Sequence, residues 1–181
     1  TAIGCGMPIV LAPAMHESMY RHPVVRRNLE SLPALGIDVV PPRIEEEKAK
    51  IAGIEEICLY AEKALTRQSL KGKKVLITSG SCREAVDSVR VLTTRSSGKM
   101  GREAALEAFR RGADVTVVSN AEIHGKIPYV KNISVTSASD MAEAVLSLPA
   151  PDYYVSAAAI SDFAPVCSAE KIHSGKPVSL E

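Results

Sequence analysis

The sequence is poor in aromatic residues and contains no tryptophan. Phe, Trp and Tyr together make up 4% of its 181 residues. Proteins that bind single-stranded nucleic acid without sequence preference stack bases on aromatic side chains, so a stacking platform is not expected. The formal net charge of +1 gives no overall attraction to nucleic acid or to a membrane surface. We therefore expect neither a nucleic acid nor a membrane as a partner.

The sequence also lacks the cysteine spacings and apolar runs that mark other classes of protein. Its cysteines lie far apart and form no CxxC pair or zinc-ligand spacing, so no metal site is predicted. Free thiols in a reducing cytoplasm are the simplest interpretation. No apolar run is long enough to span a bilayer. The residues concerned are Cys5, Cys58, Cys82 and Cys167.

Residues 1–67 alternate between strand and helix patterns. Apolar runs at 8–12 and 37–40 predict strands, and helices are expected at 23–32 and 54–67. The charged segment 43–50 is expected to be exposed. This order predicts an N-terminal α/β fragment, which we interpret as the end of a larger domain. The apolar stripe expected on the second helix consists of Ile54, Ile57, Cys58, Ala61, Ala64 and Leu65.

A linker is predicted at 68–73, and residues 74–181 are predicted to form a second α/β domain. Strands are expected at 74–78, 114–119, 132–136 and 152–157, the last of them buried. Helices are expected after Gly98 and after a capping box formed by Ser137 and Asp140. The order of strands and crossover helices predicts a Rossmann-like, doubly wound, mostly parallel sheet.

The apolar faces of these two helices can be predicted from their spacing. Gly112 is expected to end the first helix. The expected faces are Met100, Ala104, Ala105, Ala108 and Phe109 on the first helix, and Met141, Ala144, Val145 and Leu148 on the second.

Ligands of such sheets bind beyond the carboxyl ends of the strands, where loops 79–90, 93–101 and 157–163 are expected. The segment 94–101 combines hydroxyl groups, two glycines and two cations directly before a helix. A helix N-terminus offers unpaired N–H groups and a positive dipole end, which suit a phosphate or carboxylate. The alternative reading is a solvated turn that caps the helix.

Four segments occur in the order found in phosphopantothenate–cysteine ligase, and the chain resembles that family. They are 79–90, 95–101, with the sequence Arg-Ser-Ser-Gly-Lys-Met-Gly, 157–163 and 170–172. Residues 13–20 resemble the substrate-clamp motif of the flavin-dependent phosphopantothenoylcysteine decarboxylase. The two enzymes are fused in this order in a bifunctional coenzyme A biosynthesis flavoprotein, so the chain resembles a piece of that fusion.

The resemblance implies that CTP, or ATP, and Mg²⁺ activate the carboxylate of 4′-phosphopantothenate for attack by cysteine. It also implies a ligase dimer. Implied catalytic residues are Lys171, on a mobile flap, and Thr94. Implied nucleotide-binding residues are Gly80, Ser81, Ser96, Gly98, Lys99, Gly101, Asp162 and Phe163. Implied substrate-binding residues are Thr94, Arg95, Ala158, Ala159 and Asp162. The residues that match the decarboxylase clamp motif are Pro13, Ala14, Met15, His16 and Met19.

The sequence departs from the family pattern at several of these positions. Thr94 and His16 each replace the usual Asn, and Ser81 replaces a Gly. The segment 43–50 stands in place of the Cys-containing decarboxylase clamp. We therefore expect no FMN to be bound by this chain, although the parent decarboxylase uses it.

Two other interpretations stay open. One is a non-catalytic binding or assembly fragment. The less favoured one is a nicotinamide-dependent oxidoreductase, because no G-x-G-x-x-G follows the strand at 74–78.

Overall fold

The structure is a computed structural model that describes residues 2–173 and residue 175. Contacts between Cα atoms divide the chain into two compact units, residues 1–69 and 70–181. We call them unit 1 and unit 2 and describe each by itself. The assignment of domains to 1–67 and 74–181, with a linker at 68–73, stays a prediction. The last positions of the second predicted domain, 174 and 176–181, lie outside the described residues.

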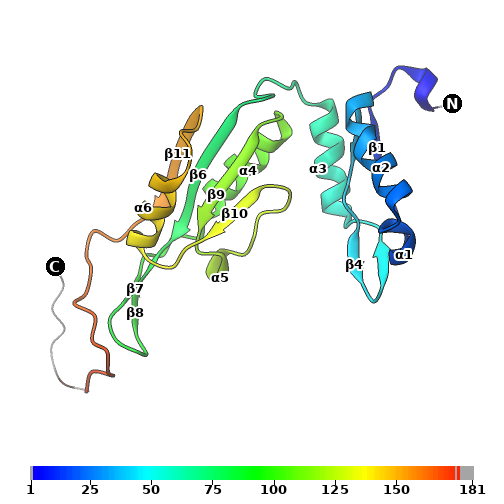
Figure 1. Cartoon of the computed structure of the whole chain (residues 1–181). Helices are drawn as coiled ribbons and strands as arrows, with labels where there is room; N and C mark the ends of the chain where they lie inside the picture. The colour runs from blue at the N-terminus through cyan, green and yellow to red at the C-terminus, as the bar shows by residue number, and fades with distance from the viewer. Residues whose placement is uncertain (1, 174, 176–181) are drawn as a thin grey trace. The chain divides into compact units, whose positions relative to one another are not determined.

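Unit 1, blue to cyan in Figure 1, contains both predicted strands and both predicted helices. The two strands pair in parallel, with Val10 opposite Asp38. Its elements are η1 (Ala2–Cys5), β1 (Ile9–Leu11), β2 (Met15–His16), α1 (Glu17–Tyr20), α2 (Pro23–Ser31), η2 (Leu32–Leu35), β3 (Ile37–Val39), β4 (Arg43–Glu45), β5 (Lys48–Lys50) and α3 (Ile54–Leu65).

The charged segment 43–50 was expected to be exposed, and residues 43–48 are exposed, but nothing in the sequence indicated its secondary structure. It forms the β4–β5 hairpin, and β5 also pairs antiparallel with β2. The hairpin turn places Glu46 and Glu47 at φ values of 50° and 58°. Glycine or asparagine usually occupies such positions, so the sequence carries no recognisable hairpin signal there. Ala49 is the buried residue of β5.

The predicted apolar stripe of α3 is wrong. Ile54, Cys58 and Leu65 are exposed, whereas Leu59 and Tyr60 are the buried residues of the helix. The helix exists where the periodicity predicts it, but unit 1 packs against a different face of it.

Unit 2 is built on a sheet with the strand order β10-β9-β6-β11 within the described residues. All three pairings are parallel, and the chain moves outward from β6 to β10 before it returns to the other side of β6. The predicted doubly wound, parallel sheet is therefore confirmed. Its elements are β6 (Lys74–Ser81), β7 (Arg83–Ala85), β8 (Val91–Thr93), α4 (Lys99–Arg110), β9 (Asp114–Ser119), α5 (Ala121–His124), β10 (Lys131–Ser134), α6 (Ala138–Ser147) and β11 (Tyr153–Ala159).

Helices α4 and α6 cover opposite faces of this sheet (Figure 1). Gly101 of α4 lies against Ser79, whereas Met141 of α6 packs against Leu76 and Val118. Because successive residues of a strand point to opposite faces, Ser79 and Leu76 of β6 face different helices. The sheet is thus covered on both sides, as parallel sheets generally are.

Helix α4 ends as predicted, but its first turn does not pack as predicted. Gly112 has a φ of 86° and donates to Phe109, while the N–H of Ala113 donates to Ala108 at 3.0 Å. These two bonds form a Schellman motif, in which glycine accepts the left-handed conformation. Met100, expected on the apolar face, is 78% exposed. Gly101, and not Met100, lies against the sheet.

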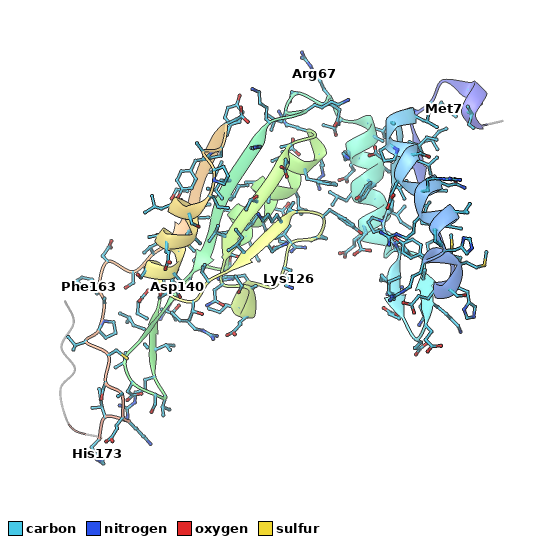
Figure 2. The ribbon with its side chains drawn as sticks, viewed as in Figure 1. Met7, Arg67, Lys126, Asp140, Phe163 and His173 are labelled. Atoms are coloured by element: carbon cyan, nitrogen blue, oxygen red, sulfur yellow. The ribbon has the colours of Figure 1, made fainter. Side chains whose placement is uncertain are left out.

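The capping box of α6 is confirmed. The Ser137 hydroxyl accepts the Asp140 N–H at 3.1 Å, and the Asp140 carboxylate accepts the Ser137 N–H at 2.9 Å. Asp140 lies at the start of the helix in Figure 2. The N–H of Ser137 lowers the pKa of Asp140. The face predicted for this helix packs into the core, with Met141 fully buried.

The last strand is in the predicted place, but the expectation that it is buried is wrong. Tyr153 and Tyr154 of β11 are 51% and 52% exposed. In the described part of the chain β11 pairs with β6 on one side and forms an edge of the sheet. Apolar periodicity identified the strand but carried no information about its position in the sheet.

Candidate functional site

The carboxyl ends of β6 and β11 lie side by side and bring two of the predicted loops together. Ala158 is opposite Gly80, and Ala159 is opposite Ser81. The chain changes direction between these two strands, since β9 and β10 lie on the other side of β6. Such a switch point is where open α/β sheets bind ligands.

The third predicted loop, 93–101, is hydrogen-bonded to both strand ends. The Ser79 hydroxyl donates to the Gly98 carbonyl at 3.1 Å, and the Thr94 hydroxyl donates to the Ala159 carbonyl at 2.9 Å. We call residues 79–81, 94–101 and 157–159 the three-loop cluster. Every predicted nucleotide or substrate position up to Ala159 lies in it.

The start of α4 gives this cluster its donor groups. Gly98 is the N-cap residue at φ 69°, and the first bond within the helix runs from the Arg102 N–H to the Gly98 carbonyl at 3.0 Å. The amides of residues 99–101 precede that bond and have no partner in the helix itself. Arg95 and Lys99 are both exposed beside them. The arrangement suits an anion at the positive end of the helix.

Gly101 has a packing role that the sequence did not reveal. A Cβ atom at this position would overlap the Cβ and Oγ atoms of Ser79. The missing side chain therefore lets α4 approach β6 closely. A ligand is not needed to explain this glycine.

His124 is a residue of this site that the sequence analysis missed. Its Nε2 accepts the Ser81 N–H at 2.9 Å and lies 3.2 Å from the Ser81 hydroxyl oxygen. A Cβ on Gly80 would overlap the imidazole, and one on Gly98 would lie 3.2 Å from it. The ring therefore fills the space above both glycines. Because Nε2 accepts an N–H, the neutral ring carries its proton on Nδ1.

Asn120 places a second unexpected polar group at this edge of the sheet. It follows Ser119, which pairs with Ser79, and it is 1% exposed. Its Oδ1 accepts the Ile123 N–H at 3.3 Å, while its buried Nδ2 has no hydrogen-bond partner among the described residues. Helix α5 begins after Asn120 and ends at His124, and its four residues are too few to show a periodic sequence signal. Only its position after a strand end could have indicated either residue.

The segment after β11 carries the remaining predicted residues. Asp162 and Phe163 are exposed, and Figure 2 shows Phe163 on the chain that leaves the strand. Lys171 is also exposed, and its neighbour Ile172 donates an N–H to Asp87 at 3.1 Å. The structure thus places Lys171 beside the loop between β7 and β8.

The clamp-like residues of unit 1 lie around β2 and α1. Pro13 is buried, whereas Ala14, His16 and Met19 are exposed and Met15 is half-buried. Met15 and His16 form β2, which pairs with strand β5 of the hairpin. A surface pocket beside them is lined by His16, Glu17, Ser18, Arg21 and Glu47.

Residues 2–173 and 175 contain no group of three His, Cys, Asp or Glu side chains placed to hold a metal ion. No helix in the same part of the chain is both long enough and apolar enough to cross a membrane. Cys82 is buried, and burial raises the pKa of its thiol.

Models of two protein families match the two units. The family model described as the DNA/pantothenate metabolism flavoprotein C-terminal domain matches residues 70–181. The chain belongs to this family. The model described as Flavoprotein matches residues 1–66.

The relatives are bifunctional coenzyme A biosynthesis proteins named CoaBC. That of Thermococcus kodakarensis is 46% identical over 180 residues, which cover 96% of this chain and 44% of the relative. That of Bacillus subtilis is 37% identical over 176 residues, covering 91% of this chain and 43% of the relative. The chain therefore spans less than half the length of these relatives. A crystal structure of the C-terminal domain of a CoaBC protein is 36% identical, with a TM-score of 0.53, and covers 63% of this chain and 55% of its own.

Proposed function

We propose that unit 2 is the nucleotide-binding part of a phosphopantothenate–cysteine ligase that acts in coenzyme A biosynthesis. The observation that carries this proposal is the three-loop cluster at the switch point of the sheet. It joins a helix N-terminus, small residues and two cations at the place where parallel sheets bind ligands. The CoaBC relatives support the role in coenzyme A biosynthesis. The ligase reaction is the one that the family resemblance of the sequence implies.

In the proposed reaction a carboxylate oxygen of 4′-phosphopantothenate attacks the α-phosphorus of CTP or ATP. The bond to the β-phosphate breaks and pyrophosphate leaves, accompanied by Mg²⁺. The amine of cysteine then attacks the acyl carbon, and the nucleotide monophosphate leaves with the bonding electrons. This chemistry depends on positioning and on neutralising phosphate charge, for which the amides of residues 99–101, Lys99 and Arg95 are suited.

Thr94 and Lys171 keep separate proposed roles. The Thr94 hydroxyl donates a hydrogen bond to the Ala159 carbonyl. While that bond is made, the hydroxyl oxygen can only accept a hydrogen bond from a substrate. Lys171 is proposed to neutralise charge at the α-phosphate. Asp162, Phe163, Ala158 and the glycines would line the nucleotide and substrate. We further propose a dimer in the cytoplasm.

Unit 1 is proposed to derive from the decarboxylase half of the fusion. Its β4–β5 hairpin occupies the sequence position of the decarboxylase clamp and contains no thiol. We propose that FMN belongs to the longer parent protein and that this chain does not hold it.

Binding of nucleotides tests the proposal directly. A ligand that binds only the folded state raises the apparent stability, so CTP or ATP should raise the melting temperature of the chain more than NAD or FMN does. Titration calorimetry should then show that Lys99→Ala weakens nucleotide binding in a salt-dependent manner. Lys131→Ala removes the same charge at the start of β10, at the opposite end of the sheet, and should bind like the parent.

The same titration separates the ligand site from a simple helix cap. If the loop only caps α4, Lys99→Ala and Lys131→Ala would bind CTP and ATP alike. Gly98→Val is a harsher test, because φ at Gly98 is 69° and the variant would lose stability as well as binding.

The alternative of a non-catalytic fragment is tested by turnover. Pyrophosphate release with CTP, 4′-phosphopantothenate and cysteine would be compared between this chain and one extended at both ends to the length of the relatives. Turnover only in the extended chain would identify the present chain as a binding fragment. No turnover in either would refute the ligase proposal.

A further inference from the structure

The segment that carries Lys171 is attached to the loop between β7 and β8 by three hydrogen bonds. The Ile172 N–H donates to Asp87 Oδ2 at 3.1 Å, and the Arg90 guanidinium donates to the Ile172 carbonyl at 3.2 Å. The Ser168 N–H donates to the Val86 carbonyl at 3.1 Å. Figure 1 shows this part of the chain (orange) running alongside the hairpin. Residues more than eighty positions apart are thus held together.

The Asp87 carboxylate is buried and hydrogen-bonded in a way that fixes its position beside this segment. Its side chain is completely buried, and its Oδ1 accepts the Val89 and Arg90 N–H groups at 2.8 and 2.7 Å. Its Oδ2 accepts the Ile172 N–H and lies 3.2 Å from the Arg90 guanidinium. Burial acts to raise the pKa of Asp87, but the three N–H donors outweigh it, and the pKa is lowered.

Both backbone groups of Ile172 are therefore bound by one ion pair. The Asp87 carboxylate accepts the Ile172 N–H, and the Arg90 guanidinium donates to the Ile172 carbonyl. The N–H of Ile172 belongs to the peptide bond that joins it to Lys171. The ion pair consequently fixes the backbone directly beside Lys171, whereas the Lys171 side chain is exposed and free to reach a ligand.

We propose that Asp87 and Arg90 are positioning residues for Lys171. This inference rests on the proposed ligase function, in which Lys171 neutralises phosphate charge. The ion pair does not touch the nucleotide. It holds residues 168–172 on the hairpin, so that the lysine is presented from a fixed backbone rather than from an unattached segment.

Cleavage by trypsin after Lys171 measures the attachment without any ligand. The peptide bond to be cut contains the Ile172 N–H, and cleavage needs this segment to detach from the hairpin. Asp87→Asn removes the charge and replaces one acceptor oxygen with a donor, so we expect the bond to be cut about tenfold faster or more. Mass spectrometry identifies the cut after Lys171 among all others.

Asp152→Asn is the matched control. Asp152 also accepts a backbone N–H, that of Lys74 at 2.8 Å, and pairs with the Lys73 ammonium at 3.2 Å. It lies at the opposite end of the sheet, before β11, so this variant should leave the cut after Lys171 at the parent rate. If Asp87→Asn melts without cooperativity, Arg90→Gln replaces it, because that variant keeps the backbone bonds of Asp87.

Kinetics in the extended chain distinguish positioning from general stability. We expect Asp87→Asn to lower kcat for pyrophosphate release by roughly 10- to 100-fold, with KM for the nucleotide nearly unchanged. Lys171→Gln should lower kcat as well. The double variant should be no slower than Lys171→Gln alone, since a lysine that is absent cannot be misplaced.

Two results would overturn the inference. One is a cut after Lys171 at the same rate in the parent, Asp87→Asn and Arg90→Gln. The other is a double variant whose losses in kcat multiply. An extended parent chain that releases no pyrophosphate would instead refute the ligase function, and the trypsin comparison would still decide whether the ion pair holds the segment.

Discussion

Replacing Gly80 with alanine tests the position of the His124 imidazole, the least expected feature of the site. Gly80 has a φ of 82°, and a Cβ added there would overlap Cδ2 and Nε2 of His124. The alanine must therefore accept the left-handed conformation and also displace the ring. Both effects destabilise unit 2, and their sizes can be estimated separately.

The backbone effect costs about 1–2 kcal/mol for a residue with a Cβ in the left-handed region. Displacing His124 breaks its bond to the Ser81 N–H, and Ser81 is buried. A buried donor left without a partner costs ~1–3 kcal/mol. The free energy of unfolding should thus fall by about 2–5 kcal/mol in Gly80→Ala, the sum of these two ranges.

Gly72→Ala isolates the first effect. Gly72 has a φ of 77°, and nothing lies within 4 Å of the position of its missing Cβ. Urea denaturation should give a loss of about 1–2 kcal/mol for this variant. The difference between the two variants then measures the displacement of His124.

A double variant completes the experiment. Once His124→Ala has removed the ring, the Gly80→Ala methyl group has space, so the two losses should not add. The expected coupling is about 1 kcal/mol or more. If Gly80→Ala and Gly72→Ala lose the same stability, and Gly80→Ala adds fully to His124→Ala, the ring does not lie over Gly80.

The remaining predictions concern the helix cap, acid stability and flavin. Ser137→Ala should lower the free energy of unfolding by about 1 kcal/mol in urea titrations, whereas Ser139→Ala, on the exposed side of the same turn, should be nearly neutral. The N–H donors named above for Asp87 and Asp140, and the Lys74 N–H for Asp152, lower the pKa values of these carboxyl groups in the folded state. Stability that they contribute is present above the unfolded carboxyl pKa and is lost as pH falls through the folded values, so melting temperatures should drop below about pH 4. A stability that stays flat to pH 2 would contradict this reading. The purified chain should show no flavin absorbance in the visible range, where amino-acid side chains do not absorb, and a yellow protein with stoichiometric flavin would contradict the prediction.

The parts of the fold that local chemistry determines could be predicted from the sequence. The helix after Ser137 was predicted from two side chains that bond each other's backbone, and its buried face follows from 3.6-residue periodicity. The end of α4 was predicted from one glycine with left-handed backbone. The parallel sheet follows from alternating strands and helices, because parallel neighbours need crossover connections.

The parts that depend on distant partners could not be predicted. The β4–β5 hairpin turns through two glutamates with positive φ, which no local rule favours. The exposed edge of β11 depends on which strands lie beside it, and strand composition does not encode that order. His124 enters the site only because α5 follows the end of β9.

The glycines of the three-loop cluster can be explained without a nucleotide. Glycines in a loop suggest close approach by a phosphate, yet His124 accounts for the missing side chains at Gly80 and Gly98, and Ser79 accounts for that at Gly101. The groups that still suit a phosphate are the amides at the start of α4 and the buried amide of Ser81. That second amide already has a partner in the His124 nitrogen. A phosphate oxygen that binds the Ser81 N–H must therefore take the place of the imidazole, so the proposed affinity for a nucleotide would include the free energy of moving His124 aside.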